Sequence, residues 1–139
     1  MSKGFGHLSF GFHLTFGLWN LDFCKSSVKL FLDNKAVTFD ALIDSGADEC
    51  IFPAWIAKTL GHNVYKGEQK IFSGIGGSVL AYLHKTHLIL NEIKIIADVY
   101  YSHEWDDMPF GLLGQAGFFL YFDVRFNYKE REILLEYLS

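Results

Sequence analysis

The sequence predicts an all-β domain with a barrel-like arrangement of short strands. Apolar and polar residues alternate with a period of two in several segments, which is the pattern of half-buried strands. Only one segment, residues 53–60, has the features of a helix. The chain has 139 residues, half of them apolar and 17% aromatic, so it can form one domain with a sizeable core and is too apolar for disorder. Many short strands and one helix favour an all-β, barrel-like domain.

The first predicted strand lies at the N-terminus. Residues 8–18 alternate strictly, and the apolar residues on one face are Leu8, Phe10, Phe12, Leu14, Phe16 and Leu18. We expect residues 1–20 to form an N-terminal arm or an added strand, and residues 21–139 to form the main domain.

The next elements lead to the most informative part of the chain. Residues 28–32 form a predicted strand, and Asp33-Asn34-Lys35 turns it into a second strand that ends at Asp44. Residues 53–60 should form the short helix, because proline suits the first helical turn and a glycine follows the last residue.

The second half of the chain continues the strand pattern. Residues 68–72 and 79–90 are typical of the two arms of a hairpin around a glycine-rich tip. A further strand, a polar loop, a helical turn and a last hairpin are expected at residues 93–101, 102–109, 115–121 and 124–137. The chain shows no linker, low-complexity tract or repeat.

The strand that ends at Asp44 leads into the motif Ala41-Leu42-Ile43-Asp44-Ser45-Gly46-Ala47-Asp48. An apolar strand of this kind presents its acid, Asp44, at a loop rather than in the core. Gly46 allows close approach of another backbone, and the Ser45 hydroxyl can hold the turn by a local hydrogen bond. An Asp that only caps a turn is the common alternative.

This motif resembles the active-site loop of aspartic proteases, in which Asp-Thr/Ser-Gly follows a hydrophobic strand. Ala47 and Asp48 extend the resemblance to the retropepsin-like branch. Two more segments agree, in the order that this branch requires. Residues 73–78, Ser-Gly-Ile-Gly-Gly-Ser, resemble a flap tip, and residues 110–115, Phe-Gly-Leu-Leu-Gly-Gln, resemble the segment beneath the active-site loop. The resemblance covers about residues 22–139 and is closest to the small free-standing proteins of prokaryotes.

The resemblance implies a retropepsin-like closed β-barrel with one or two short helices, and an aspartic endopeptidase that acts on peptide or protein substrates. It assigns catalysis to Asp44, Ser45 and Gly46, with Ser45 bracing two such loops against each other. The implied substrate-binding residues are Ala47, Asp48, Gly74, Ile75, Gly76 and Gly77. A structural ion pair at Asp48 and an ordinary hairpin loop at the glycines are the alternatives.

Aspartic proteolysis needs two carboxylates that share one proton, because two close like charges cannot both ionise. The chain has no second Asp-Ser/Thr-Gly, so the second acid must be Asp44 of another copy. We therefore expect a homodimer with its active site on a twofold axis. Gln115 stands where many family members have arginine. Glutamine can donate a hydrogen bond but cannot form the charged fork of arginine, so we expect a weaker dimer.

Other classes of function receive little support from the sequence. A net charge of −4 does not indicate a basic surface of the kind that binds nucleic acid. Cys24 and Cys50 do not make a disulfide scaffold, and Cys50 is expected to pack rather than react. His84 and His87 fall in one predicted strand, where residues three apart face opposite sides and cannot chelate one ion together.

We expect no metal and no cofactor. No membrane span or convincing signal peptide is visible, so a cytoplasmic protein is the default expectation. Two alternatives to a protease stay open. One is a non-catalytic, strand-rich peptide-binding or dimerisation module of the same fold. The other is a structural barrel with an incidental Asp-Ser-Gly.

Overall fold

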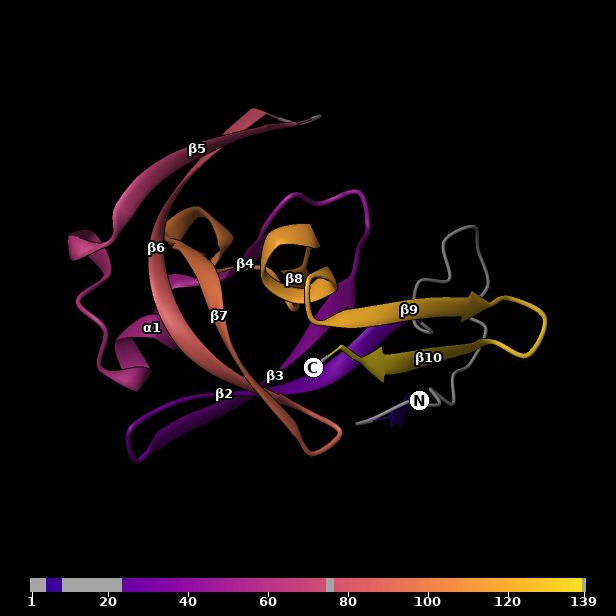
Figure 1. Cartoon of the computed structure of the whole chain (residues 1–139). Coiled ribbons are helices and arrows are strands. Elements are labelled where there is room, and N and C mark those ends of the chain that lie inside the picture. The colour runs from indigo at the N-terminus through magenta and orange to yellow at the C-terminus, as the bar shows by residue number, and fades with distance from the viewer. Residues whose placement is uncertain (1–4, 9–23, 75–76, 139) are drawn as a thin grey trace.

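The computed structural model describes residues 5–8, 24–74 and 77–138, and these are mostly β-strand (Figure 1). The strands are β1 (Phe5–Leu8), β2 (Lys25–Leu32), β3 (Lys35–Ile43), β4 (Cys50–Pro53), β5 (Glu68–Gly74), β6 (Gly77–Leu90), β7 (Ile93–Ser102), β8 (Gly111–Leu113), β9 (Phe122–Asn127) and β10 (Glu132–Tyr137). The helical elements are α1 (Ala54–Leu60), the 3-10 turns η2 (Val64–Lys66) and η3 (His103–Trp105), and the π-helical turn η4 (Gln115–Phe119). The prediction was an all-β fold with one or two short helices. The all-β class is confirmed, and the described residues contain one short α-helix and three shorter helical turns.

The larger sheet closes on itself as a barrel of six strands. The strand order is β2-β3-β8-β4-β7-β6, and the additional pairing of β2 with β6 closes the ring. β8 runs parallel to β3, and β4 runs parallel to β7, while the other pairings in the barrel are antiparallel. Closure leaves these strands without free edges, so the backbone groups of the barrel are paired internally. The predicted closed β-barrel is confirmed.

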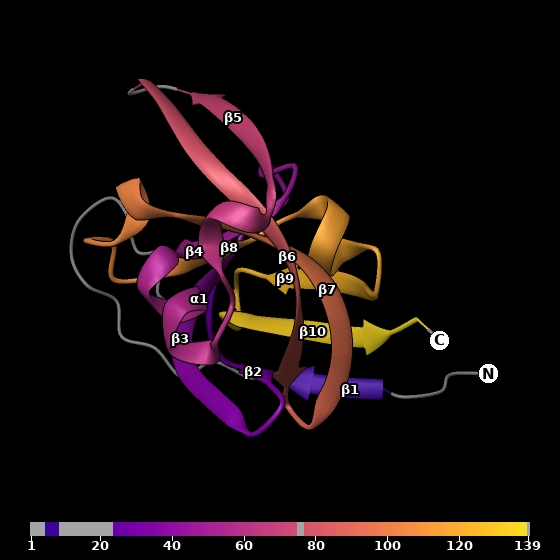
Figure 2. The same cartoon turned by 90° about the vertical axis from the view of Figure 1, so that its left-hand side faces the viewer.

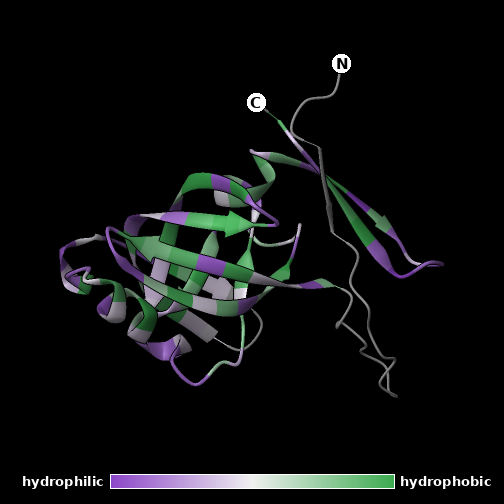
Figure 3. Cartoon of the chain, turned by 90° about the horizontal axis from the view of Figure 1, so that it is seen from below, coloured by the Kyte–Doolittle hydropathy of each residue, from purple (hydrophilic) through white to green (hydrophobic). Residues whose placement is uncertain are grey.

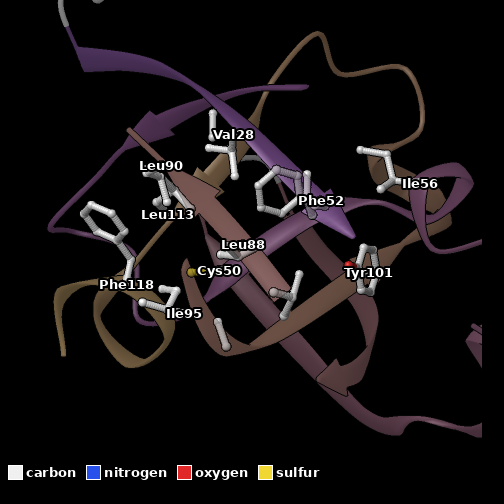
Figure 4. Close-up of a cluster of buried hydrophobic side chains, with 14 of the residues drawn as sticks. Val28, Cys50, Phe52, Ile56, Leu88, Leu90, Ile95, Tyr101, Leu113 and Phe118 are labelled. Atoms are coloured by element: carbon white, nitrogen blue, oxygen red, sulfur yellow. The ribbon is translucent and has the colours of Figure 1, made fainter. Parts of the chain in front are cut away.

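The barrel interior is filled by side chains that alternate along the strands (Figure 4). In β2, for example, Val28 and Leu30 are fully buried, while the neighbouring Ser27 and Lys29 are exposed. Burial of a Leu, Val or Phe side chain contributes about 1.5–3 kcal/mol. The helix α1 covers one end of this core with Ala54, Ile56, Ala57 and Leu60.

The strands β5 and β6 form a long hairpin that stands clear of the barrel (Figure 2). Its pairing runs from Glu68 opposite Leu83 to Gly74 opposite Gly77. The predicted hairpin arms are therefore confirmed, and both reach further toward the tip than the sequence indicated. Ile75 and Gly76, at the tip, lie outside the described residues.

A second sheet of three strands, in the order β1-β10-β9, lies beside the barrel. Figures 1 and 3 show that its β9–β10 hairpin projects away from the rest of the molecule. β1 is the part of the predicted N-terminal arm that the structure describes, and it pairs antiparallel with β10. From residue 9 onward, the predicted strand at residues 8–18 lies outside the described residues.

The structure differs from the sequence-based prediction at a few elements. β4 and β8 were not predicted as strands, because each is only a few residues long and shows no alternation of apolar and polar residues. The predicted loop at residues 102–109 begins with the last residue of β7 and then the η3 turn.

Cys24 and Cys50 are buried and free. In the part of the chain that the structure describes, no helix has the length and apolar character needed to cross a membrane.

Candidate active site

Asp44 follows directly after β3, in the loop that links the barrel strands β3 and β4. Its backbone N–H donates to the Leu113 carbonyl oxygen at 3.0 Å, which extends the parallel pairing of β3 with β8 by one step. The Gly46 N–H donates to Asp44 Oδ1 at 2.9 Å, and the Ala47 N–H donates to the Asp44 carbonyl oxygen at 3.1 Å. The carboxylate is therefore fixed by the turn that follows it, at the end of a strand, as the motif predicts.

The segment after β8 lies against this loop and supports it. The Gln115 N–H donates to the Ala47 carbonyl oxygen, and the Ala116 N–H donates to the Asp48 carbonyl oxygen, both at 2.9 Å. The Gln115 side chain adds a third hydrogen bond, from Nε2 to the Ser45 carbonyl oxygen at 2.7 Å. A neutral amide therefore holds the loop at the position where the sequence resemblance would place an arginine.

Two glycines make this close packing possible. A Cβ atom at Gly114 would lie 2.6 Å from the Ala47 carbonyl oxygen and would also collide with the Glu49 carbonyl. A Cβ atom at Gly111 would collide with the ring of Phe52. Since no side chain fits at either position, Gly114 lets the turn after β8 pack against the backbone of the Asp44 loop, and Gly111 lets β8 pack against the Phe52 ring of β4.

A cleft of about 550 Å³ opens between this loop and the β5–β6 hairpin. Its lining residues come from both sides and from η3: Asp44, Gly46, Ala47, Asp48, Glu49, Ile51, Phe72, Ser73, Val79, Trp105 and Leu112. Carboxylates therefore lie along one side of the cleft, and most of the other lining side chains are apolar.

The structure brings together most of the predicted site residues that it describes. Asp44, Gly46, Ala47 and Asp48 line the cleft. Gly74 and Gly77 pair with each other at the end of the hairpin, and Gly77 has a φ of +124°, which glycine adopts readily. Gly77 is not among the residues that line the cleft, and the predicted contacts of Ile75 and Gly76 lie outside the described residues.

Ser45 lines a second hollow, of about 360 Å³, on another side of Asp44. This hollow is formed by Cys24, Leu42, Ile43, Asp44, Ser45, Phe126 and Tyr128. Burial, and secondly the charge of Asp44, raises the pKa of the Cys24 thiol, which favours its neutral form. Asp44 thus lies between a cleft beneath the hairpin and a hollow beside the β9–β10 hairpin.

Several residues of the cleft have no signal in the sequence. In the sequence, the apolar residues of the strands are indistinguishable from ordinary core residues; these are Ile51, Phe72, Val79 and Leu112. Trp105 lies in a segment that the sequence predicts to be a loop. Glu49 is paired with Lys70 on β5 at 2.9 Å. The hydrogen bond to Glu49 is the largest cause of the raised pKa of Lys70. Only the folding of the hairpin over the loop makes these residues neighbours.

The histidines that suggest a metal site in the sequence have separate surroundings. His84 Nε2 lies 3.0 Å from the Val64 carbonyl oxygen, whereas the His87 ring stacks on Phe31 at a centroid distance of 4.8 Å. Within residues 5–8, 24–74 and 77–138, no group of three or more His, Cys, Asp or Glu side chains is arranged to hold a metal ion.

Comparison with solved structures identifies the fold. The retropepsin-like aspartic protease from Rickettsia conorii matches with a TM-score of 0.56 and 16% sequence identity, over 80% of this chain and 88% of that chain. The EIAV protease in complex with the inhibitor HBY-793 matches with a TM-score of 0.49 and 17% identity, over 66% of this chain and 80% of that chain. No protein-family model and no curated protein matches the sequence. The match to the Rickettsia conorii protein shows that the chain has the fold of the retropepsin-like aspartic proteases.

Proposed function

We propose that the protein is an aspartic endopeptidase that hydrolyses peptide bonds with a water molecule held between Asp44 and Asp44 of a second copy. The observation that carries the proposal is the position of Asp44. Its carboxylate follows a barrel strand, accepts a hydrogen bond from the Gly46 N–H, and lines a cleft beneath a long hairpin. The retropepsin-like fold supports the same conclusion.

In the proposed reaction, one Asp44 is ionised and the other carries the shared proton. The ionised carboxylate accepts a proton from water while the water oxygen attacks the peptide carbonyl carbon. The protonated carboxyl donates its hydrogen bond to the carbonyl oxygen. The proton taken from water then passes to the amide nitrogen, the C–N bond breaks, and a carboxylic acid and an amine are released. Because the pair must hold one proton, we expect a bell-shaped pH dependence with an acidic optimum.

The cleft supports a peptide as the substrate. Backbone groups of the loop, and Asp48 at its exposed end, are positioned along one side, while the hairpin lies along the other. An extended peptide fits between two such edges, where its own backbone can form hydrogen bonds. The hairpin would then exclude water from the reacting bond.

The first test is the substitution Asp44→Asn. Asparagine keeps the shape of the side chain but cannot accept the proton from water, so we expect the cleavage rate to fall by about 10²–10⁴-fold or more. Cleavage of a denatured protein, followed by mass spectrometry, measures the rate, and thermal unfolding checks the fold. Asp40→Asn is the matched control, since Asp40 is an exposed acid on the same strand.

Retained cleavage by a contamination-free Asp44→Asn preparation would refute the mechanism. A wild-type protein that binds peptide inhibitors of the aspartic class but cleaves nothing would instead identify a non-catalytic peptide-binding module.

A further inference from the structure

One outer face of the barrel is shared by the neighbouring strands β2, β6 and β7 (Figure 1). Ile89 of β6 lies opposite Lys29 of β2 on one side and opposite Lys94 of β7 on the other. The neighbours of these residues along each strand belong to the core or pack against it, so the three side chains point outward. Both lysines are exposed, and the isoleucine is partly buried. An apolar side chain therefore lies between two basic ones.

The next row of the same face is apolar and aromatic. The Phe31 ring stacks on the His87 ring at a centroid distance of 4.8 Å and an interplanar angle of 19°. The Lys94 ammonium lies 5.5 Å from the Phe31 ring centroid, which is within the range of cation–π attraction. Ile96, which is 53% exposed, lies opposite His87 and continues the row. The face thus has an accessible apolar row with lysines beside it.

A hollow of about 190 Å³ opens at the edge of this face, beside the turn between β2 and β3. Its lining includes Lys29, Phe31, Lys35 and Ile89, and Asp33 is the one carboxylate among the described residues that line it. None of these residues lines the cleft beside the catalytic loop. Pockets for small molecules are typically about 300–1,000 Å³, so the hollow suits a single side chain of a larger partner.

The lysines of this face have no acidic partners of their own. Within the part of the chain that the structure describes, Lys29, Lys35 and Lys94 form no ion pair, whereas Lys85, further along β6, is paired with Asp98 at 2.7 Å. The whole chain has a net charge of −4, so this basic surface contrasts with the rest of the molecule. Complementary charges across an interface select the partner, and this face therefore favours an acidic one.

We propose that this basic face is a docking surface for an acidic peptide segment of a partner protein. The basic face consists of Lys29, Phe31, Lys35, Ile89, Lys94 and Ile96. The segment has carboxylates that meet the three lysines and an apolar side chain that enters the hollow beside Ile89. Binding of an anionic membrane usually requires about 4–8 basic residues, more than this face has. Because the basic face is separate from the cleft, the inference does not depend on the proposed peptidase.

Fluorescence anisotropy with a short labelled peptide of alternating glutamate and leucine tests the proposal. We expect saturable binding to the wild-type protein that weakens as salt is added, because salt screens exposed charges. In Lys29→Glu/Lys94→Glu the Kd should rise at least about tenfold, since like charges would then meet at the interface. A peptide with serine in place of leucine should bind the wild type at least about tenfold more weakly, because the burial of leucine is lost.

Lys66→Glu/Lys129→Glu is the matched control, because it changes the net charge by the same amount through exposed lysines on η2 and in the turn after β9. Its Kd should equal that of the wild type. Thermal unfolding shows whether each variant folds. If Lys29→Glu/Lys94→Glu does not fold, Lys29→Gln/Lys94→Gln replaces it, with a smaller rise in Kd expected.

Three results would overturn the inference. The first is no binding of the glutamate–leucine peptide to the wild type, including the case in which phosphatidylserine vesicles bind instead, which would identify a membrane-binding surface. The second is an equal rise in Kd in both double variants, which would show a non-specific effect of net charge. The third is equal binding of the leucine and serine peptides, which would show that the hollow takes no apolar side chain.

Discussion

His62 illustrates how a single residue can make this fold sensitive to acid. It follows α1, and its Nε2 lies 3.1 Å from Thr86 Oγ1, which lies 2.8 Å from the buried Tyr101 hydroxyl. The ring of His84 lies beside it, at a centroid distance of 4.6 Å. Burial, and secondly the proximity of His84, lowers the pKa of His62. The folded protein therefore favours the neutral form.

This lowered pKa predicts a loss of stability in acid. The stabilisation is complete above the unfolded pKa of about 6.5 and is lost as the pH falls from there toward the lower folded pKa. We expect the wild-type Tm to fall more than the Tm of His62→Gln between about pH 7.5 and about pH 5. His84→Gln should retain most of the wild-type dependence, because burial is the larger cause of the shift. Equal falls for wild type and His62→Gln would contradict this account.

At the scale of elements, the position of the β5–β6 hairpin depends on contacts from both of its arms. Lys70 on β5 pairs with Glu49 beside the Asp44 loop, and its ammonium also lies 5.2 Å from the Phe72 ring centroid. Leu80 on β6 is bonded to Ser102 and to the η3 turn. These contacts hold both arms of the hairpin in place over the cleft.

We expect Lys70→Gln to weaken substrate binding without unfolding the protein. A partly exposed ion pair contributes only about 0.2–1 kcal/mol, so the Tm should change little. The hairpin arm would lose its contact with the loop, so KM should rise severalfold. Lys85→Gln is the matched control, because Lys85 forms an ion pair with Asp98 at 2.7 Å that lies away from the cleft. A KM equal to that of the control would show that the Glu49 pair does not position the hairpin.

At the scale of the whole molecule, the proposed reaction needs a second copy. The hollow on the Ser45 side of Asp44 is lined in part by Phe126 and Tyr128, which lie in and just after the projecting β9 strand. A partner that docks there would bring its own Asp44 loop near this one. The exposed Tyr128, at 68%, adds apolar surface to the same region.

Dilution tests this arrangement. If only the dimer has two acids, specific activity should fall as the protein is diluted, and Tyr128→Glu should move the midpoint to a higher concentration because charge is costly to bury. Tyr65→Glu is the matched control, since Tyr65 is 65% exposed but lies on η2. Sedimentation velocity gives the mass over the same range. A fully active monomer would rule out catalysis by two copies.

The fold class and the position of the candidate acid were predictable from local patterns in the sequence. Period-two alternation predicts strands such as β2 and β7, and the Ile43-Asp44-Ser45-Gly46 run predicts where β3 ends and its carboxylate emerges. These features depend on neighbouring residues and their local backbone preferences, so a single sequence contains them. The short strand β4 was missed because a strand buried on both faces shows no alternation. β8 was missed because it has only three residues, Gly-Leu-Leu, which show no alternation of apolar and polar side chains.

The side chains that surround Asp44 were not predictable from the sequence, because long-range contacts bring them together. The Gln115 side chain donates a hydrogen bond to the Ser45 carbonyl oxygen, and Lys70 forms an ion pair with Glu49. Trp105, from another element, lines the cleft. Their proximity follows from the closure of the barrel and from the register of the β5–β6 hairpin. A register shift of one residue would turn the hairpin side chains to the opposite face. Contacts of this kind depend on the whole barrel, and no local pattern in the sequence specifies them.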